Sequence, residues 1–297
     1  MIGAITSRAR TAAAMWAEFR ARRAVDARWQ NGAAGRPSDG GPPIVISLTS
    51  YRPRFATLVP TLKSLLRQTL PPEHVLLWVG QRDADALPDE VRAMETEGLR
   101  IMPREDLRSF TKFIHAVREY PEHRIAICDD DTWYRPHWLE QLATPLPAGQ
   151  IACHRIHRIK LDPAGHPIAY NDWEQASAAR DASPLNFPTG VGGVLFRPSQ
   201  MAPEIVDAEE ALRLCPSADD VWLYWMGRLA GSTFVRVGNN DSLVSWRGSQ
   251  SVALWRTNNI GHNANDEQIR AMIERFGDAV FERSADASAP ARAHAFA

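Results

Sequence analysis

The hydrophobic and polar positions of this chain alternate between strand-like and helix-like patterns from residue 43 onward. Short apolar runs rich in β-branched residues predict four buried strands, at 44–48, 75–79, 100–102 and 124–128. Helices are expected between them, at 58–70, 89–97 and 113–117. Strands joined by helices form parallel β-α-β units, so this half of the chain is expected to be Rossmann-like.

The second half of the chain has a mixed pattern. Strand-like segments occur at 151–159, 194–196 and 234–237. Helices are expected at 136–142, 219–229 and 266–276. The predicted fold class is therefore α/β, with a mixed, mostly parallel sheet flanked by helices.

The two ends of the chain differ from its centre. Residues 1–29 predict a helix with an apolar stripe, and residues 1–41 hold seven arginines against three acidic residues, a formal charge of +4. A basic amphipathic helix can lie on an anionic membrane, but it could equally dock on the parent domain or form a frayed arm. We expect a basic helix and flexible linker over 1–42, a catalytic domain over 43–282 and a disordered tail over 283–297.

Composition excludes several classes of protein. With 297 residues, 44% hydrophobic and 23% charged, the chain is neither a disordered protein, a collagen-like fibre nor a coiled coil. A net charge of −1 is not that of a nucleic-acid binder. Three cysteines without a CxxC motif argue against a disulfide framework or zinc ribbon and fit a reducing cytosol. Because no apolar run is long enough to span a bilayer, we expect a cytoplasmic protein.

Three consecutive carboxylates follow the fourth predicted strand, at Asp129, Asp130 and Asp131. The carboxyl end of a parallel strand opens into the ligand crevice of such sheets. Alternate residues of an extended segment share a face, so Asp129 and Asp131 are expected to converge. A hard divalent cation, Mn²⁺ or Mg²⁺, would relieve their repulsion and leave positions for substrate phosphates. The alternative is a solvated turn in which Asp131 helps the next helix to begin.

The segment around these carboxylates, IAICDDDTWYRPHWLEQL, resembles the strand, DXD motif and helix of GT-A fold glycosyltransferases. Four further segments resemble bacterial family-2-type enzymes of capsule, lipopolysaccharide and other surface glycans: VISLTSYRPR, LKSLLRQTLPPEHVLLWVG, FPTGVGGVLFRP and CPSADDVWL. The resemblance covers about residues 43–276. It implies a metal-dependent transferase that moves a sugar from a nucleotide-diphosphate donor to a glycan or lipid-linked acceptor, with inversion, at the cytosolic face of the inner membrane.

The resemblance also implies roles on the donor side. Asp131 would ligate the metal, with Asp129 on the metal or ribose side, Asp130 beside them, and His262 as a late third ligand. Lys112 would bind phosphate, unless it is a plain surface lysine. The first strand-to-helix loop would hold the nucleotide through Thr49, Ser50, Tyr51 and Arg52. In such a loop the Tyr51 ring could stack on a nucleotide base, and Arg52 or Arg54 could pair with phosphate oxygens. The alternative is a solvated loop without a ligand.

A second acidic pair, Asp219 and Asp220, precedes an apolar helical segment. Negative side chains in a first helical turn stabilise the helix, so capping alone is one interpretation. The resemblance implies instead that one of the two is the catalytic base, which takes the proton of the acceptor hydroxyl. The sequence does not decide between them.

Three further features are candidates for sugar or acceptor binding. Thr189, Gly190, Gly192 and Gly193 lie in a glycine-rich loop whose backbone could approach a sugar closely, or simply turn tightly. Trp173, in a polar loop, is expected to contact the acceptor. On the strand-like segment 151–159, His154 and Arg158 share parity and could face the cleft together.

Two other classes of function remain open. A nucleotidyltransferase also combines a Rossmann-like sheet with carboxylate-held Mg²⁺, but it usually opens with a glycine-rich loop, and residues 48–54 contain no glycine. The third possible function is that of a non-catalytic, glycan-binding partner in a glycan-assembly complex. The intact acidic clusters at 129–131 and 219–220 count against it.

Overall fold

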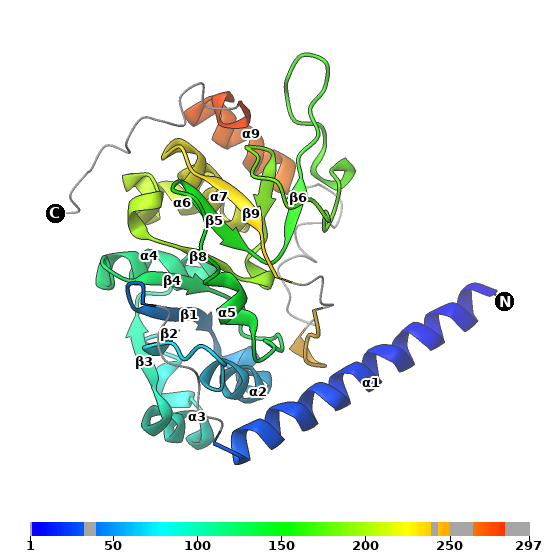
Figure 1. The fold of residues 1–297 in the computed structure, drawn as a ribbon, viewed down its shortest axis with the longest axis vertical. Helices are drawn as coiled ribbons and strands as arrows, with labels where there is room; N and C mark the ends of the chain where they lie inside the picture. Colours follow the sequence, from blue (N-terminus) through cyan, green and yellow to red (C-terminus); the bar gives the residue numbers. More distant parts are fainter. Residues whose placement is uncertain (1, 33–39, 239–242, 250–263, 283–297) are drawn as a thin grey trace.

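The computed structural model describes residues 2–32, 40–238, 243–249 and 264–282, and of residues 2–11 only the backbone (Figure 1). The predictions for the centre of the linker, for His262 and for the tail from residue 283 therefore lie outside the described residues.

The centre of the fold is a seven-stranded sheet with the order β3-β2-β1-β4-β8-β5-β9. Its strands are β1 (Ile44–Ser50), β2 (His74–Gly80), β3 (Leu99–Arg104), β4 (Arg124–Ile127), β5 (Gln150–Cys153), β8 (Val194–Phe196) and β9 (Thr233–Arg236). Strand β8 is antiparallel to both of its neighbours, and the other adjacent pairs are parallel. The predicted mixed, mostly parallel sheet is confirmed.

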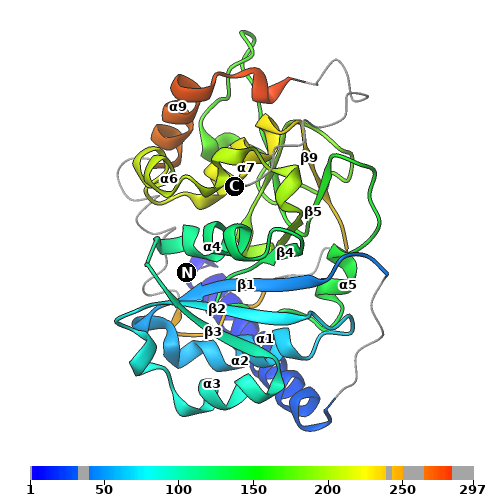
Figure 2. The same cartoon turned by 90° about the vertical axis from the view of Figure 1, so that its left-hand side faces the viewer.

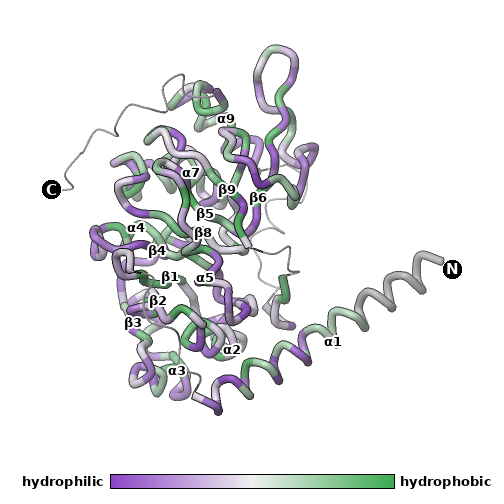
Figure 3. The backbone as a smooth tube through the Cα atoms, in the orientation of Figure 1, coloured by the Kyte–Doolittle hydropathy of each residue, from purple (hydrophilic) through white to green (hydrophobic). Residues whose placement is uncertain are grey.

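Helices cover both faces of this sheet. Figure 2 shows α4 (Thr111–Glu119), α6 (Ala208–Leu214), α7 (Asp219–Leu229) and α9 (Ala264–Phe276) on one side of β1–β3, and α2 (Phe55–Leu66) and α3 (Asp89–Ala93) on the other. A short helix, α5 (Trp138–Leu142), follows β4. The alternating side chains of β1 show why helices cover both faces of the sheet. Ile46 and Leu48 point to one face and pack in the layer of α2, whereas Val45 points to the other face and packs in the layer of α4. Hydrophobic residues accordingly concentrate on the central strands (Figure 3).

The segment predicted as one strand over 151–159 is interrupted. Strand β5 ends at Cys153, and β6 (Ile156–Arg158) pairs with β7 (Asn186–Pro188) in a separate two-stranded sheet. Neither β7 nor α6 was predicted, because β7 (NFP) is not an apolar run and α6 (AEEALRL) has too few apolar positions to show a helical period. The interruption changes which side chains reach the functional cavity, as described below.

Helix α1 (Ile2–Gln30) packs on the domain by one face only. Its Ala21 and Val25 form a small cluster with Val244 and Trp246, and the Arg28 side chain donates a hydrogen bond to the Arg67 carbonyl over 2.6 Å. Its N-terminal half extends away from the domain (Figure 1). Near the middle of the helix, Trp16 is 65% and Phe19 52% exposed. Among the described helices, none combines the length and the apolar character that crossing a bilayer requires.

Candidate functional site

A cavity of about 790 Å³ lies at the carboxyl ends of β1 and β4, against the N-terminus of α7. It brings together segments that are far apart in the sequence, since its wall also includes Tyr170, Asn171 and Gln175 and, from a later segment, Phe187, Thr189, Gly190 and Val191. Most of the predicted site residues line it: Thr49, Ser50, Tyr51, Lys112, Asp129, Asp130, Asp131, Thr189, Gly190, Asp219 and Asp220.

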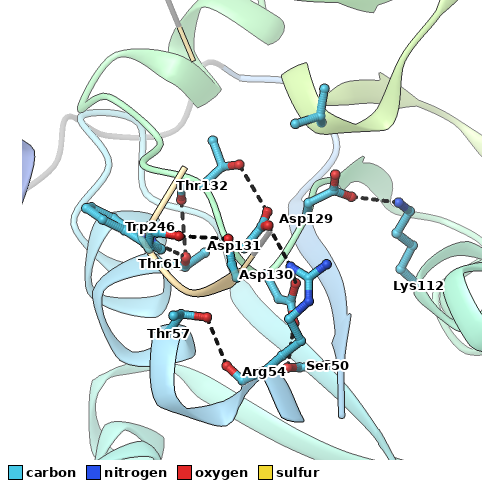
Figure 4. A network of polar contacts seen from close by, with 12 residues as sticks. Ser50, Arg54, Thr57, Thr61, Lys112, Asp129, Asp130, Asp131, Thr132 and Trp246 are labelled. Atoms are coloured by element: carbon cyan, nitrogen blue, oxygen red, sulfur yellow. Dashed lines mark hydrogen bonds and ion pairs between the residues drawn. The ribbon is translucent and has the colours of Figure 1, made fainter. Parts of the chain in front are cut away.

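One side of the cavity is an ion cluster around Arg54. The Arg54 Nη1 lies 2.6 Å from Asp131 Oδ2 and 3.3 Å from Asp130 Oδ1, and Ser50 Oγ donates to Asp130 Oδ2 over 2.6 Å (Figure 4). Burial raises the pKa of Asp130 to about 7, although the Arg54 charge acts against this. Burial disfavours the charged guanidinium, but Asp130 and Asp131 outweigh it and raise the pKa of Arg54. These carboxylates are thus part of a buried network, not of a solvated turn.

Lys112 joins the two acidic clusters. Its Nζ lies 2.9 Å from Asp129 Oδ1 and 3.0 Å from Asp219 Oδ2, and its side chain is only 5% exposed. Burial lowers the pKa of Lys112, but the neighbouring carboxylates raise it well above its ordinary value. The lysine predicted as a phosphate ligand or a surface residue is therefore a buried bridge on the cavity wall.

Asp129 and Asp131 do not converge as the strand parity predicted. Asp129 points toward Lys112, whereas Asp131 is held by Arg54 (Figure 4). Strand β4 ends at Ile127, and Asp130 and Asp131 lie in a turn, so the alternation of an extended segment no longer applies. Tyr134, a residue that the sequence analysis missed, fixes this loop: its hydroxyl accepts from the Asp129 backbone N–H over 2.8 Å and donates to the Val191 carbonyl over 3.2 Å.

The acidic pair at the start of α7 has contacts outside its own helix. Asp220 Oδ1 accepts a hydrogen bond from the Gly190 backbone N–H over 2.8 Å, while Asp219 is bound to Lys112. Ala218 occupies the N-cap position without a side-chain cap. Burial and the adjacent Asp219 charge raise the pKa of Asp220 to about 7. A carboxylate with such a pKa is suited to accept a proton near neutral pH.

The glycines of the predicted sugar-binding loop have different roles. A Cβ on Gly190 would lie 3.1 Å from both Asp220 Oδ1 and Lys112 Nζ, so this glycine lets the backbone approach the acidic pair. A Cβ on Gly192 would meet Arg155 at 2.8 Å, and one on Gly193 would meet the Trp138 ring at 2.5 Å. Neither Gly192 nor Gly193 is among the cavity-lining residues. For these two, the expectation of sugar contact is corrected to a packing role.

Replacing Gly193 with alanine is expected to lower the free energy of unfolding by about 3 kcal/mol or more. Gly193 has φ +97°, and the added Cβ would also overlap the Trp138 ring, so strain and overpacking both apply. Gly165→Ala is the matched control, because Gly165 has φ +92° but no atom within 4 Å of the added Cβ, and should cost about 1 kcal/mol. Urea unfolding of both variants measures the difference, and equal losses would contradict the packing role.

Two further expectations are corrected. The Trp173 side chain is only 3% exposed, its Nε1 donates to the Ile168 carbonyl, and it is not part of the cavity wall, which includes its neighbour Tyr170 instead. The Arg52 side chain lies 3.7 Å from Asp83 at the surface, so Arg54 is the arginine of this loop that reaches the cavity.

Arg155 and His157 line the cavity although the sequence analysis favoured His154 and Arg158. His154 contacts the Trp138 carbonyl, and Arg158 is ion-paired with Asp181 at 2.9 Å. The break between β5 and β6 shifts the alternation by one residue, and the spacing of apolar positions gives no sign of it.

The side chains of the cavity wall fit a divalent cation that is shared with a ligand. The cavity wall holds six aspartates against four arginines and lysines, a formal charge of −2 when every carboxylate is ionised, so a bound diphosphate would need positive charge. Among the described residues, no three His, Cys, Asp or Glu side chains are grouped to enclose a metal ion. One or two carboxylates together with phosphate oxygens is, however, the ligand set that Mg²⁺ commonly uses.

Comparisons with known proteins leave the family of the chain open. No protein-family profile matches it, and no curated protein sequence matches it. Among solved structures it is similar to the inositol-1-phosphate CTP transferase from T. maritima, with 10% sequence identity and a TM-score of 0.39, over 75% of this chain and 98% of that chain. The resemblance to glycosyltransferases therefore stays a prediction.

Proposed function

We propose that this chain transfers a sugar from a nucleotide-diphosphate donor to a glycan or lipid-linked acceptor. The observation that supports this most is the placement of Lys112, which joins Asp129 of the first acidic cluster to Asp219, directly beside Asp220, within one cavity. A donor site and a proton acceptor are thereby held side by side, as direct displacement requires.

The donor would bind over the ends of β1 and β4. Thr49, Ser50 and Tyr51 line this part of the cavity, and the half-exposed Tyr51 ring offers a face to a nucleotide base. Asp131 would hold Mn²⁺ or Mg²⁺ together with phosphate oxygens of the donor, and the ion when bound would offset the negative charge of the diphosphate. Arg54 and Lys112 keep the carboxylates in place and add positive charge on the same side.

Asp220 would act as the base on the acceptor side. Its carboxylate takes the proton of the acceptor hydroxyl while that oxygen bonds to the anomeric carbon and the bond from this carbon to the diphosphate breaks. The Gly190 N–H holds one carboxylate oxygen, so the other can face the acceptor. Displacement from the opposite side would invert the anomeric configuration.

Product analysis tests this function directly. The chain is incubated with a panel of nucleotide sugars, Mn²⁺ and candidate acceptors, and the released nucleotide is identified. Release of nucleoside diphosphate supports sugar transfer. Release of pyrophosphate from a nucleoside triphosphate and a sugar phosphate identifies a nucleotidyltransferase instead, which uses the same type of sheet and carboxylates. Donor binding without turnover over the whole panel identifies a glycan-binding partner.

Replacing Asp131 with asparagine is expected to weaken Mn²⁺-dependent binding of nucleoside diphosphate by about tenfold or more, because an amide is a poor ligand for a hard cation. The fold should persist, since Arg54 keeps Asp130 as its partner. Calorimetric titration with and without Mn²⁺ measures the effect. Asp85→Asn, an exposed aspartate that does not line the cavity, is the control. Unchanged Mn²⁺ dependence in the Asp131 variant would refute the metal role.

We also propose that α1 makes a peripheral contact with the cytosolic face of an anionic membrane. Trp16 and Phe19 form an exposed edge-to-face pair with ring centroids 5.9 Å apart, and the Arg23 guanidinium lies 5.9 Å from the Phe19 ring. This face is separate from the one that docks on the domain. Aromatic rings flanked by arginines suit the interface of an anionic bilayer.

Sedimentation with vesicles tests the membrane contact. Trp16→Ser with Phe19→Ser should reduce binding to phosphatidylglycerol vesicles by about tenfold or more, since burying one large apolar side chain contributes about 1.5–3 kcal/mol. Leu229→Ser, which removes an exposed apolar side chain from α7, should leave binding unchanged. Equal binding of the double variant and the unchanged chain would exclude this surface.

A further inference from the structure

Two of the four cations in the cavity wall, Arg108 and Arg155, form no ion pair among the described residues. Arg108 is exposed and donates to the Pro216 carbonyl, so Arg155 is the more buried of the two. Arg54 and Lys112 each contact two carboxylates, whereas Arg155 forms no ion pair with any Asp or Glu in the described part of the chain. Its Nη1 donates to Thr189 Oγ1 over 3.0 Å and lies 3.3 Å from His157 Nε2, and no other acceptor among the described residues takes its remaining N–H groups. A half-buried guanidinium therefore lines the cavity with unused donors.

His157 adds a second donor at the same place. Its side chain is only 2% exposed, and its Nδ1 lies 2.9 Å from the backbone nitrogen of Ala176, which can only donate. Nδ1 must therefore accept, so the ring proton is on Nε2. Burial, together with the Arg155 charge, lowers the pKa of His157 to about 3, so the ring is neutral. The Nε2 lies 3.3 Å from Arg155 Nη1, which places two donors side by side.

Two donors at this spacing cannot satisfy one another, but one oxyanion can accept from both. We propose that Arg155 and His157 form a subsite for a carboxylate or phosphate group carried by the acceptor. This inference rests on the proposed function, and it narrows the acceptor to an acidic or phosphorylated glycan or lipid-linked sugar.

The subsite lies on the acceptor side of the base. Arg155 is bound to Thr189, and the next residue, Gly190, donates its backbone N–H to Asp220. On the other side of this pair, Asp219 is bound to Lys112 and through it to Asp129. The order of contacts therefore runs from Arg155 through Asp220 and Lys112 to the donor carboxylates. An anion at Arg155 would be next to the attacking hydroxyl and not on the leaving diphosphate.

Binding of three simple probes tests the subsite without any need for turnover. Glucose, glucuronate and glucose 6-phosphate are titrated into the full chain by calorimetry. One or both anions should bind about tenfold more tightly than glucose, a typical gain for hydrogen bonds to a charged group. The glucuronate and phosphate titrations distinguish a carboxylate from a phosphate ligand. The Arg155→Gln variant should bind the three probes within about twofold of one another, as expected once the charge is removed.

One control variant and two further variants complete the test. Arg158→Gln removes a neighbouring guanidinium that is paired with Asp181 outside the cavity, and it should keep the preference for anions. Arg155→Lys keeps the charge but loses the planar guanidinium that can donate two parallel hydrogen bonds, so it should keep only part of the preference for anions. This variant tests the subsite even if Arg155→Gln does not fold. His157→Asn should also reduce the preference.

Several outcomes would overturn the proposal. These are equal or undetectable binding of all three probes by the unchanged chain, a full preference for anions in Arg155→Gln, and weaker binding of nucleoside diphosphate in that variant. The last would place Arg155 on the donor side. Because the probes are bound and not converted, loss of the anion preference and absence of sugar transfer are separate results.

Discussion

Asp220→Asn is expected to lower kcat by about 10²- to 10⁴-fold, the range for removal of a general base. The asparagine amide cannot take the proton of the acceptor hydroxyl, but its oxygen can still accept the hydrogen bond from the Gly190 N–H. The fold and the binding of donor should therefore remain. Product formation and calorimetric donor binding, measured on the same preparation, check the two halves of this expectation.

The pH profile provides a second check on the same residue. A base must be deprotonated to act, and the pKa of Asp220 is about 7, so kcat/KM should fall as the pH drops through about 7. Burial is the first cause of this raised pKa and the Asp219 charge is the second. Asp219→Asn should therefore move the midpoint of the profile to lower pH and keep activity. Activity that survives in Asp220→Asn and disappears in Asp219→Asn would make Asp219 the base.

Lys112→Met is expected to lower the free energy of unfolding by about 3–5 kcal/mol, as removal of one partner from a buried ion pair generally does. The variant leaves Asp129 and Asp219 without their shared cation beside the partly buried Asp220. Urea unfolding at pH 8 measures the loss. The loss should be smaller at pH 5, because Asp220, whose pKa is about 7 and is lowered by the Lys112 charge, is protonated there and no longer gains from the lysine.

Lys63→Met is the matched control for Lys112. Lys63 pairs with Glu90 at 2.8 Å, but this glutamate is 58% exposed, so water screens the pair. The control should lose no more than about 1 kcal/mol. Similar losses for the two variants would show that Lys112 does not carry the buried charge assigned to it.

The regular elements with clear apolar periods could be predicted from the sequence. Leu58, Leu62 and Leu65 recur at helical spacing and lie buried in α2, and the apolar runs at 44–48 and 75–79 became β1 and β2. The interruption at His154 and Arg155 could not be predicted, because the apolar pattern continues through it on both sides. It depends on the pairing of β6 with β7, a contact between residues about thirty positions apart.

The candidate site was predictable to a similar degree. Consecutive carboxylates after an apolar strand, and a second pair before an apolar helix, marked the two acidic clusters. The sequence analysis named Arg54 and Lys112 as candidates for binding phosphate, but it did not predict that they pair with these carboxylates, because such ion pairs join segments that meet only in the folded chain. Trp173 illustrates the converse: a polar sequence context suggested exposure, but the ring packs against Tyr170 and Phe187 in the core.

The sequence by itself determined the α/β class, the order of its main elements and the two groups of aspartates, at 129–131 and 219–220, that line the cavity, because hydrophobic periodicity and clustered charge are local properties. Only the tertiary structure decided that Lys112 bridges these groups, that Asp220 has the raised pKa, and that Arg155 and His157 meet with no carboxylate partner from the part of the chain that the structure describes. Each of these depends on distance and burial between segments remote in the chain. Local composition does not encode the electrostatic energy that such proximity creates.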